Sequence, residues 1–322
     1  MNQNLAKDIK IAYLGTPELS AVVLEDLIKD GFTISGLFCR PDKKAGRGKK
    51  VVQCPTKLVA LEYDVPVFQP KDKDELTEQL KNLKSDLAIV FAYGMIIPKE
   101  AFEAPKYKTL NIHPSLLPKY RGPSPINWPI LSEDKETGVS IIEIVEKMDA
   151  GHIMSQNKIN IEGTDTAKTL GDKLVKLGSQ MLTELIPKWI EGGFKGITQD
   201  YSQATYTRLL TKDDGRIDWS KSASEIERQI RAYTPWPGSF TSWEKGNGKK
   251  LVLKIIQTKI GDDQKNKNLK VGEVYLNDNG RLSVQTKNGS LIIEKLQLGG
   301  KNELTSEEFL RGYPDIIGTT LL

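Results

Sequence analysis

The chain has 322 residues, of which 38% are hydrophobic and 27% charged, with a formal net charge of +4. This length suits two domains, the composition is that of an ordinary globular protein, and no apolar run approaches the roughly 20 residues that span a bilayer. The only cysteines are Cys39 and Cys54 and the only histidines His113 and His152, which excludes a disulfide framework, gives no zinc pattern and favours a cytoplasmic protein.

The alternation of strands and helices over the first part of the chain predicts a doubly wound, mostly parallel α/β sheet. Thr16 is a candidate cap and Pro17 a candidate first helical residue of the first helix. Strands are expected at 9–14, 34–38, 86–92, 109–112, 139–145 and 153–161, helices at 72–83 and 165–190, and a further helix and strand within 55–68. The glycine fingerprint of dinucleotide binding is missing, and so is the phosphate loop of the NTPases.

The C-terminal part has a different pattern. A polar, weakly periodic stretch at 193–207 is interpreted as a linker. Beyond it, short strand-like runs separated by turns such as Asn279-Gly280 predict a small β-barrel. The predicted domains are therefore 1–192, a linker at 193–207, and 208–322.

Positive charge is unevenly distributed along the chain. The whole excess lies from Arg208 onward, and within the balanced remainder the segment Arg40–Lys50 carries six basic residues against Asp42 alone. This distribution suggests a polyanionic partner, although a solvated charged loop is the simpler alternative.

The stretch from Asn111 to Trp128 combines a strand end with a proline-rich loop. Asn111 and His113 are two residues apart on the expected strand, so their side chains face the same side. Asp149, which follows another strand, could reach the imidazole. An amide to stabilise an oxyanion, an imidazole and an orienting carboxylate suit acyl transfer. A purely structural role for the histidine remains the alternative, and His152 is the weaker catalytic candidate.

Several motifs together resemble the 10-formyltetrahydrofolate-dependent formyltransferases. The segments 111–122 and 149–151 resemble the signature of the whole family. The segments 41–50, 215–219 and 235–238 resemble the branch of that family that formylates initiator methionyl-tRNA. Asn127 and His152 depart from the usual pattern without touching the expected chemistry. Arg208 stands where a lysine is common, so the charge is kept but the contacts of the two side chains are not equivalent.

The resemblance implies a folate-holding N-terminal domain and a C-terminal barrel of the oligonucleotide-binding type. It implies 10-formyltetrahydrofolate as formyl donor, initiator methionyl-tRNA as acceptor, no metal and a monomer. It places the catalytic roles on Asn111, His113 and Asp149. The implied folate contacts are Ser115, Leu116, Leu117, Pro118, Phe91, Tyr93, Gly94 and Ile96. The implied tRNA contacts are Arg47, Lys43, Lys44, Lys49, Lys50 and Arg208.

Four rival interpretations stay open at this point. A formyltransferase for an amino sugar nucleotide would share the fold and the three site residues, but the basic segment argues against it. A glycinamide ribonucleotide formyltransferase would lack the C-terminal domain. A hydrolase of formyl-folate would release formate without tRNA. A nucleic-acid-binding protein with a degenerate enzyme domain is disfavoured by the intact Asn111, His113 and Asp149.

Overall fold

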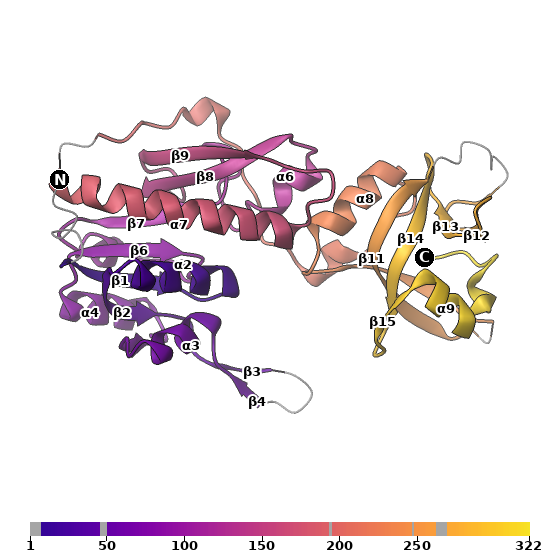
Figure 1. Ribbon diagram of the computed structural model, residues 1–322, viewed down its shortest axis with the longest axis horizontal. Helices are drawn as coiled ribbons and strands as arrows, with labels where there is room; N and C mark the ends of the chain where they lie inside the picture. The colour runs from indigo at the N-terminus through magenta and orange to yellow at the C-terminus, as the bar shows by residue number, and fades with distance from the viewer. Residues whose placement is uncertain (1–7, 46–49, 193–194, 247, 262–268) are drawn as a thin grey trace. The chain divides into compact units, whose positions relative to one another are not determined.

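Figure 1 shows the computed structural model, which describes residues 8–45, 50–192, 195–246, 248–261 and 269–322. The chain forms two compact units. The first unit runs up to Pro125 and also takes 136–160 and 171–208, and the second takes 126–135, 161–170 and 209–322. The two short segments 126–135 and 161–170 therefore group with the C-terminal part, although residues of the first unit follow each of them in the chain.

The first unit is built on a seven-stranded sheet with the order β5-β2-β1-β6-β7-β8-β9. The pairs from β5 to β7 are parallel, whereas β8 and β9 are antiparallel additions at one edge. The strands are β1 (Lys10–Gly15), β2 (Thr33–Phe38), β5 (Val67–Phe68), β6 (Leu87–Phe91), β7 (Thr109–His113), β8 (Glu136–Glu143) and β9 (Ile153–Asn160).

Helices between and after these strands lie beside the sheet (Figure 1). They are α2 (Glu18–Lys29), α3 (Pro55–Glu62), α4 (Lys73–Leu83), α5 (Lys99–Phe102) and α7 (Ala167–Glu191). The central strands β1 and β6 are apolar almost throughout because both of their faces are covered, as is usual in parallel sheets. The predicted doubly wound, mostly parallel sheet is confirmed.

The start of α2 differs from the prediction. The helix begins at Glu18, with Pro17 at the N-cap position and no side-chain cap, so the capping role predicted for Thr16 is wrong. The Thr16 hydroxyl instead donates to the Tyr93 carbonyl at 2.9 Å and accepts from the Arg40 amide at 3.3 Å. It therefore ties together the ends of three neighbouring strands, where polar loop groups need partners.

The second unit is an antiparallel barrel. Its strands follow the order β10-β11-β14-β13-β12, and β15 pairs with β14. They are β10 (Ser239–Glu244), β11 (Lys250–Gly261), β12 (Val274–Leu276), β13 (Leu282–Gln285), β14 (Ser290–Leu298) and β15 (Glu303–Thr305). The C-terminal tail closes the sheet, because Leu322 exchanges two backbone hydrogen bonds with Ser242 of β10 while Thr320 bridges to Glu273 beside β12.

Trp243 fills the centre of this barrel and packs edge-on against Phe309 and Tyr313 at centroid distances of 6.2 and 6.0 Å. The helices of the unit are α6 (Asn127–Leu131), α8 (Ala223–Ala232) and α9 (Ser306–Gly312), with 3₁₀ turns η2 (Lys212–Gly215) and η3 (Pro314–Ile316). The predicted barrel is confirmed, but β10 and β15 were not expected. No helix among the described residues is long and apolar enough to cross a membrane.

Candidate active site

Asn111 and His113 lie at the carboxyl end of β7, where the parallel part of the sheet meets its antiparallel edge. Asn111 pairs in register with Val90 of β6 and with Ile142 of β8, and His113 pairs with Ser140. The carboxyl end of a parallel strand is the usual position of a ligand site in α/β sheets. The sheet therefore places both predicted residues at the edge where α/β proteins usually bind ligands, although only Asn111 lines the cavity described below.

The loop after β7 is held by two polar side chains from the antiparallel strands. The Ser140 hydroxyl donates to the Ser115 carbonyl at 2.7 Å and accepts from the Leu117 amide at 3.1 Å. The Gln156 amide donates to the Leu117 carbonyl at 3.0 Å and to Ser140 at 2.8 Å. Neither Ser140 nor Gln156 was predicted from the sequence.

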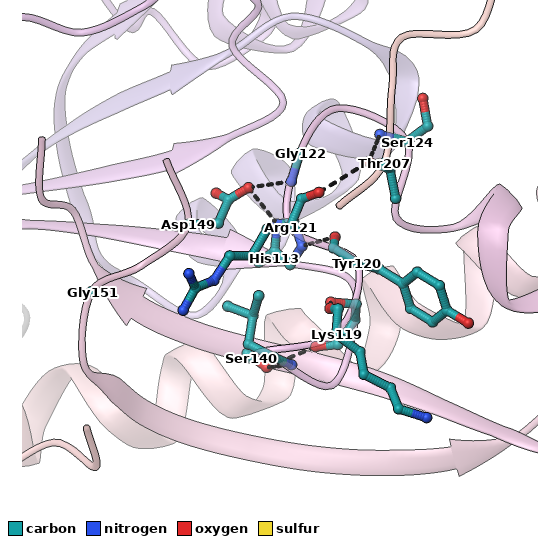
Figure 2. A network of polar contacts seen from close by, with 12 residues as sticks. His113, Lys119, Tyr120, Arg121, Gly122, Ser124, Ser140, Asp149, Gly151 and Thr207 are labelled. Carbon is teal, nitrogen blue, oxygen red and sulfur yellow. Dashed lines mark hydrogen bonds and ion pairs between the residues drawn. The ribbon is translucent and has the colours of Figure 1, made fainter. Parts of the chain in front are cut away.

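His113 is almost fully buried, and its two ring nitrogens have different surroundings (Figure 2). Nε2 lies 2.9 Å from the Tyr120 carbonyl oxygen, which can only accept, so Nε2 carries the hydrogen. Nδ1 lies 3.7 Å from Oδ2 of Asp149. That separation is too long for a hydrogen bond but short enough for strong attraction once Nδ1 is protonated. The Tyr120 carbonyl thus orients the ring, and Asp149 acts on it through charge.

The Asp149 carboxylate is itself fixed by the same loop, because Oδ2 accepts from the Gly122 amide at 2.7 Å. Gly122 has a φ of +110°, and a Cβ atom there would lie 2.7 Å from the Thr207 carbonyl oxygen. Position 122 therefore requires glycine both for its conformation and for space.

A cavity of about 440 Å³ opens beside these residues. Most of its wall is apolar, formed by Val90, Met95, Ile96, Ile97, Ile142, Ile144, Val145 and Met148. Asn111, Glu146 and Asp149 contribute polar groups. An apolar cavity with a few polar groups is the usual form of a small-molecule site. The Ile142–Met148 wall was not predicted, although its position just before Asp149 was a usable signal.

The residues implied as folate contacts are placed in three ways. Gly94 and Ile96 line the cavity. Phe91, Tyr93, Ser115 and Leu117 are buried, and Leu116 and Pro118 are partly exposed on the loop. Burial raises the pKa of the Tyr93 phenol, whose hydroxyl has no hydrogen-bond partner among the described residues. Ser115 donates to the Lys119 carbonyl at 2.7 Å, which stiffens the loop from inside.

A third layer of the site comes from residues 197–207, called the strap below. It includes the 3₁₀ turn η1 (Tyr201–Gln203) and runs beside the Tyr120–Gly122 loop. The Arg121 amide donates to the Thr205 carbonyl at 2.9 Å, and the Thr207 amide donates to the Arg121 carbonyl at 2.7 Å. The Tyr120 amide donates to the Thr205 hydroxyl at 2.8 Å. Residues predicted as a linker are therefore integral to the loop that carries the site.

The basic segment forms a two-stranded hairpin from β3 (Lys43–Ala45) and β4 (Lys50–Val52). Lys43 is exposed, Lys44 and Lys50 belong to its strands, and the predicted contacts Arg47 and Lys49 lie outside the described residues. Arg208 is exposed after the strap. Asp42 beneath the hairpin accepts from Lys57 at 2.6 Å and from Gln69 at 2.9 Å, and the Lys57 contact lowers the Asp42 pKa. Lys57 of α3 thus balances the charge of Asp42, the one acidic residue of the segment 40–50.

Among the described residues, no group of histidine, cysteine and acidic side chains could hold a metal ion. The site instead combines an amide, an imidazole and a carboxylate beside an apolar cavity. These groups suit transfer of an acyl group, since they supply hydrogen-bond donors and a proton carrier.

Comparison with known proteins assigns the chain to a family. Residues 9–186 match the formyl transferase family, and residues 209–314 match the formyl transferase C-terminal domain. The chain is 38% identical over 98% of its length to the methionyl-tRNA formyltransferase of Dehalococcoides mccartyi (strain CBDB1), covering 99% of that protein. It is 39% identical over 94% of its length to the methionyl-tRNA formyltransferase of Alkaliphilus oremlandii (strain OhILAs), covering 96% of it.

Among solved structures, HypX from Aquifex aeolicus in complex with tetrahydrofolic acid is similar, with a TM-score of 0.66 and 20% identity. That match covers 96% of this chain and 48% of HypX, and at this identity it speaks for the fold alone. The two domain matches and the full-length relatives agree with each other. The chain belongs to the formyl transferase family.

Proposed function

We propose that the protein transfers the formyl group of 10-formyltetrahydrofolate to the α-amino group of methionine carried by initiator methionyl-tRNA. The observation that carries the proposal is the likeness to methionyl-tRNA formyltransferases over nearly the whole chain, including the C-terminal domain. The Asn111, His113 and Asp149 arrangement supports it, because its chemistry is that of formyl transfer.

The cavity beside Asn111 is the proposed donor site. Its apolar wall suits a flat pterin ring, and Asn111 and Asp149 provide the polar groups that would orient the donor. Leu116 and Pro118 are partly exposed on the adjoining loop and would support the rest of the folate. Ser115 and Leu117 are buried beneath them, so their contribution is to hold that loop in place.

The proposed reaction begins with attack of the neutral methionine amine on the formyl carbon. The carbonyl oxygen becomes an oxyanion, which the Asn111 amide and the protonated His113 stabilise by donating hydrogen bonds. Because Nε2 already donates to Tyr120, Nδ1 is the nitrogen that gains and gives the proton. Asp149 stabilises the resulting imidazolium across 3.7 Å. The proton lost by the amine ends on N10, so tetrahydrofolate leaves neutral at that atom.

The acceptor would be held largely through its phosphates. The β3–β4 hairpin and Arg208 carry the proposed contacts, and the net positive charge of the chain lies from Arg208 onward. Such contacts weaken as the salt concentration rises, because the condensed counterions that the protein releases from the tRNA then gain less entropy. We further propose that the protein works as a monomer in the cytoplasm, where its charged tRNA acceptor occurs. A sedimentation measurement giving a stable dimer would contradict the first point.

The test is a formyl-transfer assay with purified protein, 10-formyltetrahydrofolate and methionyl-tRNA. Initiator methionyl-tRNA should be formylated, and elongator methionyl-tRNA should react much more slowly. Asn111→Leu, which keeps the side-chain size and removes the donor, should lower kcat by about 10² to 10³. No formyl transfer to tRNA, together with transfer to an amino sugar nucleotide or to water, would refute the proposal.

A further inference from the structure

The turn that carries Asp149 is bound by side chains of the strap at three successive backbone carbonyls. The Gln199 amide nitrogen donates to the Asp149 carbonyl at 2.8 Å and to the Gly151 carbonyl at 2.7 Å. The Tyr201 hydroxyl donates to the Ala150 carbonyl between them at 3.1 Å. Both side chains come from a segment about fifty residues further along the chain, so local sequence does not create this turn.

The orientation of the Gln199 amide is determined by its other partner. Its Oε1 accepts from Nη2 of Arg121 at 2.7 Å and from Nε at 3.1 Å. Because a guanidinium only donates, the oxygen must face Arg121 and the NH₂ group must face the turn. Gln199 is 4% exposed and Arg121 is 0% exposed. Neither of the two amide hydrogens is left over, and water has little access to replace the contacts.

The Asp149–Gly151 turn has two features that require the hydrogen bonds from the strap. Asp149 has a φ of +50°, a left-handed conformation that residues other than glycine adopt infrequently. Its carboxylate must at the same time accept from the Gly122 amide and face Nδ1 of His113. A turn released by a fraction of an ångström would therefore change the position of the carboxylate relative to the ring.

We propose that Gln199 is a positioning residue for formyl transfer, which acts by holding the Asp149–Gly151 turn so that the Asp149 carboxylate stays opposite His113. Gln199 touches neither reacting group, so its effect on the reaction passes through Asp149. The inference rests on the proposed function for its kinetic consequence. Its structural part, the support of the turn, is measurable without any substrate.

The kinetic test is Gln199→Met, which keeps the side-chain length and removes every hydrogen bond. Gln203→Met is the matched control, because Gln203 lies in the same strap but is exposed and its side chain donates to Asp200 of the strap itself. Gln199→Met should lower kcat about 10- to 100-fold, as expected for misplacement of a catalytic group, with the KM for the folate donor changed less than about twofold. Gln203→Met should behave as wild type.

A double-mutant cycle separates positioning from general loss of structure. If Gln199 acts through Asp149, adding Gln199→Met to Asp149→Asn should lower kcat little further, whereas independent effects would multiply. Gln199→Glu retains an acceptor for Arg121 but loses both donors to the turn, so it should be as impaired as Gln199→Met. Multiplying effects, or normal activity of Gln199→Glu, would overturn the proposal.

Amide hydrogen exchange of Gly122 gives the readout that needs no activity. The Gly122 amide donates to Asp149, so its exchange should accelerate at least tenfold in Gln199→Met and stay unchanged in Gln203→Met. Unchanged protection in Gln199→Met would refute the support of the turn. If the wild type transfers no formyl group to methionyl-tRNA, the proposed function fails while this measurement still decides whether Gln199 holds the turn.

Discussion

Replacing Asp149 by asparagine removes one charge while keeping the local structure. Asparagine retains an oxygen that can accept from the Gly122 amide, and it tolerates the positive φ at this position. The lost interaction is the attraction between the carboxylate and Nδ1 of a protonated His113, 3.7 Å apart, with side chains only 15% and 5% exposed. At an effective dielectric constant of about 20, two unit charges near 4 Å attract by roughly 4 kcal/mol.

If the full attraction stabilises the transition state, kcat should fall about 10³-fold, because each 1.36 kcal/mol is a factor of ten. Rearranged water would return part of this, so the expected loss is about 10² to 10³. Initial rates of methionyl-tRNA formylation measure it. Asp64→Asn is the matched control, since Asp64 is an exposed aspartate with a φ of 56°. An Asp149→Asn enzyme that folds normally and keeps a third of the wild-type kcat would refute the charge argument.

Three further predictions concern the acceptor, the donor and stability. Arg47→Ala should raise the KM for methionyl-tRNA, not for folate, and reduce the slope of log K against log salt by about one; equal effects on both KM values would contradict it. Ile96→Asp in the cavity wall should weaken folate binding about tenfold by calorimetry, since apolar contact of about 1 to 2 kcal/mol is lost, and unchanged affinity would exclude this cavity. The hydrogen bond from Lys57 lowers the Asp42 pKa below its ordinary value of 3.8, so the carboxylate stabilises the fold at higher pH and this contribution is lost as pH falls through the lowered pKa. The Tm difference between wild type and Asp42→Asn should therefore shrink steadily as the pH is lowered into that range.

The elements that sequence reasoning located well are those whose pattern is local. Every residue of β6 is buried, and so is every residue of β1 except Lys10, while α7 has a long apolar stripe. The predicted start of a helix was wrong where a side chain forms hydrogen bonds with residues far away in the sequence. Thr16 looks like a cap because threonine often caps helices, but its hydroxyl is taken by Tyr93 and Arg40, 77 and 24 residues away. The edge strand β15 has three residues, too few for a periodic signal.

The residues of the site show the same contrast between local signals and long-range contacts. The sequence alone places Asn111 and His113 on one face of the sheet, because they lie two residues apart on the same strand. Ser140 could be located only with the antiparallel register of β7 and β8 in hand, which pairs it with His113. Gln199 carries no local signal at all, since a glutamine in a polar stretch is indistinguishable from a linker residue until the fold brings it to Arg121 and to the turn carbonyls.

A buried polar side chain that satisfies several distant backbone groups costs much to replace but leaves no mark in periodicity. In this chain the prolines of the catalytic loop restrict that loop from within, whereas the strap restricts both the loop and the Asp149 turn from outside. The prolines alone would leave the distance between His113 and Asp149 free to vary, because the two residues belong to different segments. The strap contacts both segments, and for that reason the separation of 3.7 Å depends on residues that the chain reaches only after its longest helix.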